Sequence, residues 1–198
     1  VIRHFHETDL KVAPAVQTGI DDAVRLFRDH GAVVSDVTLS PLQDWHACGS
    51  LISITERAAA YEEWARTRLG DFSDRVQRRL MLGAFVSGVD YVQAVRRRRE
   101  LRAELQAAMA ELDVVITAGA PGEAPKLDGV ARWDVFASPN FTIPFNVSGY
   151  PAIAVCTTGA LMIRPFTMIA IRRFTFCRVT SSKRRYRRPR RALATTTT

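Results

Sequence analysis

The chain has 198 residues, of which 47% are hydrophobic and 24% charged, and this composition excludes a largely disordered chain. No run approaches the roughly 18 consecutive apolar residues of a membrane-spanning helix. The N-terminal residues carry charges where a signal peptide has an apolar segment, and the first residue is not Met, which fits either a processed start or a piece of a longer chain. We therefore expect a cytoplasmic protein with no membrane partner.

The formal net charge of +8 is unevenly distributed. Residues 161–198 contain 11 Lys and Arg and no Asp or Glu, whereas residues 1–160 contain 17 basic and 20 acidic residues. We predict two parts: a mildly acidic folded body at 1–160 and a basic, low-complexity tail at 161–198. The tail is expected to add no buried core, and to be disordered or loosely docked at least from Ser181 onward.

The body is predicted to begin with a helix and a strand. Apolar residues recur at helical spacing from about Ala15 to His30, with Pro14 suited to the first turn and Gly31 to the C-terminal cap. Residues 33–39 are rich in β-branched side chains and predict a strand. A helix followed directly by such a strand is typical of an α/β fold.

Three further helices are predicted, from about Leu51 to Arg68, from Asp74 to about Phe85 and from Tyr91 to about Leu112. Asp90 is expected to be the N-cap of the last one. Four arginines at 96–99 precede Glu100 and Glu104, which can pair with them at helical spacing. This interleaving favours a solvated helix face over a nucleic-acid contact.

Two short apolar runs complete the predicted sheet. Residues 114–117 indicate a strand buried on both faces, and Ala152–Val155 a second core strand. Residues 118–134, rich in Gly and Pro, indicate a long surface loop between them. We expect the strands near 33–39, 114–117 and 152–155 to share one sheet, with helices packed over it.

Four segments carry recognisable motifs in a consistent order. Residues 113–125 are similar to the pattern D-hydrophobic-T-P-x-x-P-x-x-A-P, and residues 141–155, FTIPFNVSGYPAIAV, contain PFNxxGxPA. Upstream, residues 79–98 match a helix pair with R-x-x-x-G and Y-x-x-A-x-x-x-R, and residues 56–59 resemble a Glu-Ala-Ala helix. Together they cover residues 10–157 and resemble the C-terminal part of amidase signature enzymes.

The resemblance implies a partial amidase-signature fold: an α/β structure with a mixed sheet covered by helices. It also implies hydrolysis of carboxylic amide C–N bonds by a Ser nucleophile, a second Ser held by a cis peptide and a Lys base. In the family these residues lie in a Gly/Ser-rich segment of the N-terminal half. The partners implied are a small-molecule amide and this missing N-terminal half; the chain's own status as an enzyme stays uncertain.

The chain lacks this catalytic segment. It has no Gly-Gly pair, its only Ser-Ser is Ser181-Ser182 in the basic tail, and Lys11, Lys126 and Lys183 occur in no matching context. A Ser hydroxyl is a poor nucleophile without a positioned base and oxyanion donors. We therefore assign no catalytic residue, and expect the isolated chain to be inactive. Residues 87–92 lack the aromatics of GYYDAYY, which favours a general amidase, with the A subunit of a tRNA-dependent amidotransferase as the alternative.

Asn146, Gly149 and Pro151 form a predicted structural motif. The Asn146 amide can satisfy backbone groups while the chain turns into the strand at Ala152–Val155. A direct contact of Asn146 with substrate is the alternative.

The tail departs from the family after Gly159. An abrupt loss of all acidic residues at a family boundary is what a frameshift in a GC-rich gene produces. The alternative is a nucleic-acid-binding protein on an amidase-derived scaffold, which would use the arginines around Tyr186. The other two reading frames beyond Gly159 discriminate between these hypotheses.

No metal or other cofactor is expected. The chain has three cysteines, Cys48, Cys156 and Cys177, an odd number with no CxxC pair. This argues against a disulfide framework or a zinc site. His46 with Cys48 is interpreted as a loop pair rather than as a thiol site. An N-terminal group could be imagined as metal ligands, but we interpret it as solvated: His4, His6, Glu7 and Asp9.

Overall fold

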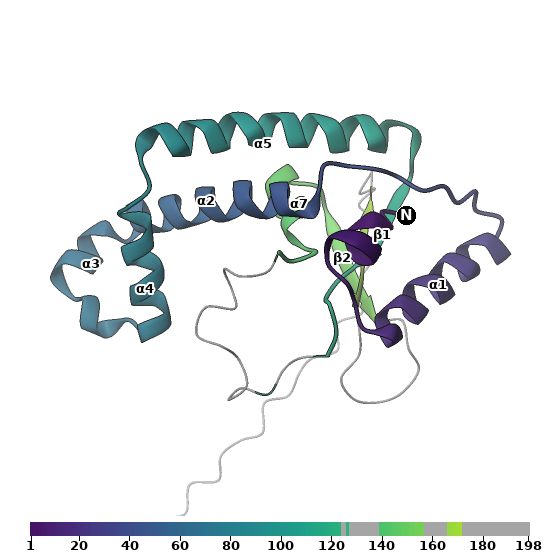
Figure 1. Ribbon diagram of the computed structural model, residues 1–198, viewed down its shortest axis with the longest axis horizontal. Helices are drawn as coiled ribbons and strands as arrows, with labels where there is room; N and C mark the ends of the chain where they lie inside the picture. Colours follow the sequence, from purple (N-terminus) through teal and green to yellow (C-terminus); the bar gives the residue numbers. More distant parts are fainter. Residues whose placement is uncertain (124–125, 127–138, 157–165, 172–198) are drawn as a thin grey trace, which may run out of the picture.

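The computed structural model describes residues 1–123, 126, 139–156 and 166–171. Figure 1 shows α5 lying along one side with α2 beneath it, α3 and α4 at one end, and the strands with α1 at the other end. None of the helices in the described part of the chain has the length and hydrophobicity needed to cross a bilayer.

The chain begins with a π-helical turn, η1 (Phe5–Asp9), and then α1 (Pro14–Asp29). The helical layer consists of α2 (Leu42–Ala60), α3 (Glu62–Thr67), α4 (Asp74–Gly83) and α5 (Gly88–Ala108), with 3-10 turns at Leu69–Asp71 and Met109–Glu111. The remaining elements are β1 (Val114–Ala118), α7 (Ile143–Ser148), β2 (Ala152–Cys156) and β3 (Phe166–Ile171). The predicted helices at 15–30, 74–85 and 91–112 and the strands at 114–117 and 152–155 are thereby confirmed within a few residues.

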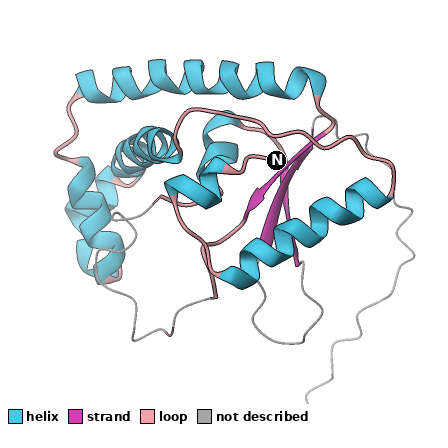
Figure 2. Ribbon diagram, turned by 45° about the vertical axis from the view of Figure 1, so that its right-hand side comes forward, coloured by secondary structure: helices cyan, strands magenta, loops and turns pink. Residues whose placement is uncertain are grey.

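The described strands form an antiparallel sheet in the order β1-β3-β2, which Figure 2 shows beside α1. The prediction that 114–117 and 152–155 share a sheet is confirmed, but the two strands are not neighbours. Residues 166–171 lie between them, in register from Val114 opposite Ile171 and from Ala152 opposite Ala170.

Residues 161–198 are expected to add no buried core, but the structure includes residues 166–171 as the middle strand of this sheet. This run, FTMIAI, contains no charge and is bracketed by Arg164 and by Arg172 and Arg173. Six apolar or β-compatible residues are enough for one strand, although the composition averaged over the tail is strongly basic. The segment from Ser181 onward lies outside the described residues.

The predicted strand at 33–39 is wrong. This segment is extended but irregular, and its backbone bonds go to the first residue: the Val1 amino group donates to Ser35 O at 2.7 Å and Val37 N donates to Val1 O at 2.8 Å. The Val33 side chain is 98% exposed. β-Branched residues favour a strand only where a neighbouring strand supplies the ladder, and within the described residues none does.

The helical structure predicted from 51 to 68 is confirmed for residues 51–60 and 62–67, but its bounds differ: α2 begins nine residues earlier and ends at Ala60, before the separate helix α3. The buried stripe of α2 runs through Leu42, Trp45, Gly49 and Ile52, at helical spacing. The first half of α2 also contains Asp44, His46 and Gly49, which have low helix propensity. For this reason the sequence did not predict that the helix begins before residue 51.

Ser87, not Asp90, is the N-cap of α5. The Ser87 hydroxyl accepts from the Asp90 backbone N–H at 3.1 Å and donates to the Asp90 carboxylate at 2.7 Å. Asp90 is thus the third residue of the helix, where its carboxylate accepts from the Ser87 hydroxyl, rather than the cap itself.

The core joins the helices to the sheet. The largest fully buried side chains, Trp45, Phe5 and Phe141, come from α2, η1 and the turn before α7. Two polar contacts tie the start of α2 to α5: Glu104 accepts from Ser40 N at 2.6 Å and from Ser40 Oγ at 2.7 Å, and Arg97 pairs with Asp44 at 2.8 Å.

The close packing of α4 on α2 generates a testable prediction. A Cβ atom at Gly83 would overlap the Ala58 side chain and lie 2.7 Å from Ile54 O. We expect Gly83→Ala to lower the free energy of unfolding by about 1–3 kcal/mol, because overpacking outweighs the gain in helix propensity. Gly88→Ala, where nothing lies within 4 Å, is the matched control in urea unfolding. Equal stability of the two variants would contradict this packing.

Candidate functional site

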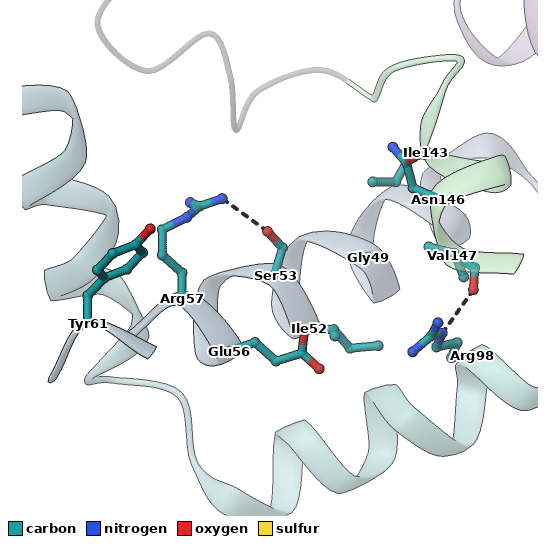
Figure 3. Close-up of a pocket in the computed structure, with 10 residues that line it drawn as sticks. All are labelled: Gly49, Ile52, Ser53, Glu56, Arg57, Tyr61, Arg98, Ile143, Asn146 and Val147. Carbon is teal, nitrogen blue, oxygen red and sulfur yellow. Dashed lines mark hydrogen bonds between the residues drawn. The ribbon is translucent and has the colours of Figure 1, made fainter. Parts of the chain in front are cut away.

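A pocket of about 540 Å³ opens where α2, α5 and α7 meet (Figure 3). Its wall combines an apolar end with polar and charged side chains. The lining residues are Gly49, Ile52, Ser53, Glu56, Arg57, Tyr61, Arg98, Ile143, Asn146 and Val147.

Helix packing and two side-chain contacts shape this pocket. α7 lies so close to α2 that a Cβ at Gly49 would approach Ile143 and Val147 at 2.8 Å. The Arg98 guanidinium of α5 donates through Nε to Val147 O at 2.9 Å and so ties α5 to α7. On α2, Arg57 donates to the Ser53 hydroxyl at 3.2 Å, as Figure 3 shows.

Glu56 of α2, which also lines the pocket, makes a second contact between α2 and α5. Its carboxylate accepts a hydrogen bond from the Tyr91 hydroxyl of α5 at 3.1 Å. This bond, more than burial, raises the pKa of the Tyr91 hydroxyl above its usual value. Tyr91 therefore stays protonated as a donor and links α2 to α5 at the pocket rim.

The predicted motif Asn146, Gly149 and Pro151 lies at the end of α7. Asn146 is exposed and lines the pocket, Pro151 is exposed, and Gly149 ends the helix with φ +77°. The backbone of the turn is bonded by Ser148, whose hydroxyl accepts from Tyr150 N at 3.3 Å and donates to Phe145 O at 3.3 Å. Sequence reasoning missed Ser148, although a Ser two residues before a turn N–H is a recognised signal for such a contact.

Ser53, one of the hydroxyl-bearing side chains of this pocket, is not hydrogen-bonded to a base in the described part of the chain. Its bonded neighbour is the Arg57 guanidinium, which has donors only and stays protonated. A guanidinium cannot take the proton that a Ser nucleophile must lose. Ser53 is therefore not an activated nucleophile in this arrangement.

A Ser–His contact on α2 is equally incomplete. Ser50 Oγ lies 3.5 Å from His46 Nε2, one helical turn away. His46 is buried, its Nδ1 has no hydrogen-bond partner, and burial lowers the pKa of the imidazole. An orienting group on the second nitrogen is what holds the base in a Ser-His-Asp site. The pair thus lacks the third member.

Cys48 is a buried helix residue, so the predicted loop pair with His46 is wrong. Its thiol donates to Ala94 O at 3.3 Å, and burial raises the pKa of the thiol. A protonated, buried thiol is inert as a nucleophile. The Cys156 side chain and Cys177 lie outside the described features.

The interpretation of the N-terminal histidines as solvated is wrong for His6. Only 1% of His6 is exposed, because η1 packs against β1 and α2. Glu7 pairs with Arg3 at 3.3 Å, and the Asp9 carboxylate accepts from Leu42 N at 2.8 Å at the start of α2. In the described part of the chain no group of three or more His, Cys, Asp or Glu is placed to hold a metal ion.

The arginines at 96–99 divide between structural contacts and solvent. Arg97 pairs with Glu100 at 2.8 Å, as predicted, and also with Asp44. The predicted partner Glu104 instead accepts from Ser40.

A comparison with known protein families identifies the fold. Residues 1–160 match the family model Amidase. The chain belongs to the amidase family. Its curated relatives include the A subunits of glutamyl-tRNA(Gln) amidotransferase from Clostridium botulinum (strain Eklund 17B / Type B), 25% identical over 169 residues, and from Synechococcus sp. (strain WH7803), 34% identical over 180 residues. These matches cover 72% and 76% of this chain but 35% and 37% of the relatives, so the chain spans about a third of their length.

Solved amidase structures share this fold. A crystal structure of amidase superposes with a TM-score of 0.65 at 22% identity, over 82% of this chain and 43% of the other. The 6-aminohexanoate cyclic dimer hydrolase complexed with substrate gives 0.66 at 18% identity, over 83% and 39%. The A subunit of the Thermotoga maritima glutamyl-tRNA(Gln) amidotransferase gives 0.56 at 25% identity, over 87% and 38%.

The buried imidazoles predict acid sensitivity of the amidase body. Burial lowers the pKa of His6 and of His46 below their ordinary value. As the pH falls, the unfolded chain therefore binds more protons at these histidines than the folded chain does. The folded chain loses the stability conferred by its neutral histidines as the pH falls below about 6.5. We expect the free energy of unfolding in urea to decrease between pH 7 and pH 5.

The contribution of His6 is measured from the change in the free energy of unfolding with pH, not from its value at one pH. His6→Phe should flatten the decrease, because it removes a buried imidazole whose pKa burial lowers. Identical slopes for the wild type and His6→Phe would contradict the burial of a neutral His6.

Proposed function

We propose that this chain contributes part of the body of an enzyme that hydrolyses carboxylic amide C–N bonds, and that the Ser-Ser-Lys set for the reaction lies outside this chain. The observation that carries the proposal is the family match over residues 1–160. The pocket supports it, because Ser53 faces a guanidinium; elsewhere on α2, Ser50 contacts a histidine without an orienting group. The body thus supplies walls and positioning while another segment supplies the nucleophile.

The walls of the pocket suit a small amide with an apolar acyl group. Ile52, Ile143 and Val147 provide apolar surface for such a group. We propose a general amidase. The A subunit of a tRNA-dependent amidotransferase is the second candidate, favoured by the names of the curated relatives. The nucleic-acid alternative depends on residues 183–191, which lie outside the described residues.

The purified 198-residue chain is expected not to turn over a simple aryl amide. The reason is the missing nucleophile–base pair, without which the uncatalysed barrier is essentially unchanged. Product release is measured by absorbance, with Ser50→Ala and Ser53→Ala as controls that should match the wild type. Turnover by the chain alone that a serine-directed reagent abolishes would overturn the proposal.

We also propose that Asn146, Gly149 and Pro151 are structural. Gly149 adopts φ +77°, a conformation in which a Cβ costs roughly 1–2 kcal/mol. Gly149→Ala should lower the free energy of unfolding by about 1 kcal/mol, measured in urea, whereas Gly70→Ala should not. Asn146→Ala should lower it as well. If Asn146→Ala leaves stability unchanged and lowers only the activity of a complete enzyme, Asn146 contacts substrate instead.

A further inference from the structure

The pocket between α2, α5 and α7 has an apolar end and a cationic end. At the apolar end, Ile143 and Val147 of α7 lie so close to Gly49 of α2 that an added Cβ would come within 2.8 Å of both side chains. Arg57 lines the pocket further along α2. Because a helix rises 1.5 Å per residue, about 12 Å along α2 separates Gly49 from Arg57. One ligand can therefore place an apolar part and a charged part in different surroundings.

Arg57 has hydrogen-bonding capacity that the chain does not use. Its half-buried guanidinium donates through Nη2 to the neutral Ser53 hydroxyl at 3.2 Å, and in the described part of the chain no Asp or Glu pairs with it. A guanidinium carries five N–H donors and keeps its positive charge at any physiological pH. Arg57 can therefore donate further hydrogen bonds to an anionic group in the pocket.

The carboxylate of Glu56, the next residue on α2, does not neutralise this charge. Figure 3 shows Glu56 and Arg57 leaving α2 on different sides, with Glu56 directed toward α5. There the Glu56 carboxylate accepts a hydrogen bond from the Tyr91 hydroxyl at 3.1 Å. Glu56 is thus held by α5 and leaves the cationic end of the pocket to Arg57.

Other positive charges lie near Arg57. Burial lowers the pKa of the Arg79 guanidinium, and the charges of Arg57 and Arg75 lower it further. Three arginines of α2 and α4 therefore lie within electrostatic reach of one another, and this positive potential favours an anion. Residues 56–59 read Glu-Arg-Ala-Ala, so the cation is not part of the Glu-Ala-Ala pattern that this segment resembles.

We propose that Arg57 binds a carboxylate of the substrate, so that the pocket takes an amide whose apolar chain ends in a carboxylate. The inference rests on the proposed function, in which this pocket holds the acyl part of the amide. The apolar chain lies along Ile143 and Val147, and the carboxylate accepts two N–H bonds from the Arg57 guanidinium. Bidentate pairs of this kind are stronger than neutral hydrogen bonds, so a neutral end group of the same shape binds more weakly.

The experiment measures binding by titration calorimetry on the full 198-residue chain, so it does not depend on turnover. The probes are suberic acid monoamide and suberamide, which differ only in a carboxylate that the second replaces with a carboxamide. Each is about as long as three extended residues, roughly 10 Å. The test variant is Arg57→Gln. The matched control is Arg99→Gln, which removes the same charge at an exposed position of α5 that does not line the pocket.

We expect the wild type and Arg99→Gln to bind the monoamide at least fivefold more tightly than the diamide. Arg57→Gln should bind both probes with equal affinity, with its affinity for the diamide and its circular dichroism spectrum unchanged. A residue that only supports the fold would instead change the binding of both probes to the same extent. The preference of the wild type should also decrease as salt is added, because salt screens a half-exposed charge pair.

Equal binding of the two probes by the wild type, or a preference for the monoamide that persists in Arg57→Gln, overturns the carboxylate assignment and leaves the proposed function standing. Acetate carries the carboxylate without the chain. If acetate binds as tightly as the monoamide, Arg57 belongs to a site for free anions and the substrate assignment is overturned. Binding of neither probe overturns the proposal and also removes the pocket as support for the proposed function.

Discussion

The structure depends on the close packing of α2. This helix contacts α4, α5, α7 and η1, and at two places the contact requires the absence of a side chain: at Gly49 of α2 against α7, and at Gly83 of α4 against α2. Trp45 is fully buried in the core and donates its indole N–H to Ser40 O at 3.1 Å. Protein interiors are packed at nearly crystalline density, so the buried face of α2 constrains the positions of these neighbours.

The pocket follows from this packing. Its walls are the exposed flank of α2 and the faces of α5 and α7 that α2 holds in place, tied by Arg98 to Val147 and by Tyr91 to Glu56. Both contacts hold in place the helices that form the pocket walls. At the pocket itself, the Ser53 hydroxyl is bonded to the Arg57 guanidinium, which cannot accept its proton.

Local patterns predicted part of this fold, and nonlocal contacts account for the failures. The strand at 114–117 was predictable because a buried strand is apolar throughout, whereas residues 33–39 have a similar composition without a ladder partner. Residues 166–171 were hidden by the basic residues on either side. At the site, residues 146–151 lie at the end of α7, a helix that no local pattern predicted, and the role of Ser148 and the burial of His6 depend on tertiary neighbours. The pocket joins three helices distant in sequence and carries no local signal.

Native-state hydrogen exchange on the chain alone tests the central role of α2 most directly. If the body depends on α2, the amides of residues 46–60 exchange only through global unfolding, with an opening free energy equal to that from urea denaturation. Exchange is also expected to be faster in β2, at the edge of the sheet, than in α2. Exchange of the α2 amides through local opening, while α1 and β1 stay protected, would contradict the central role of this helix.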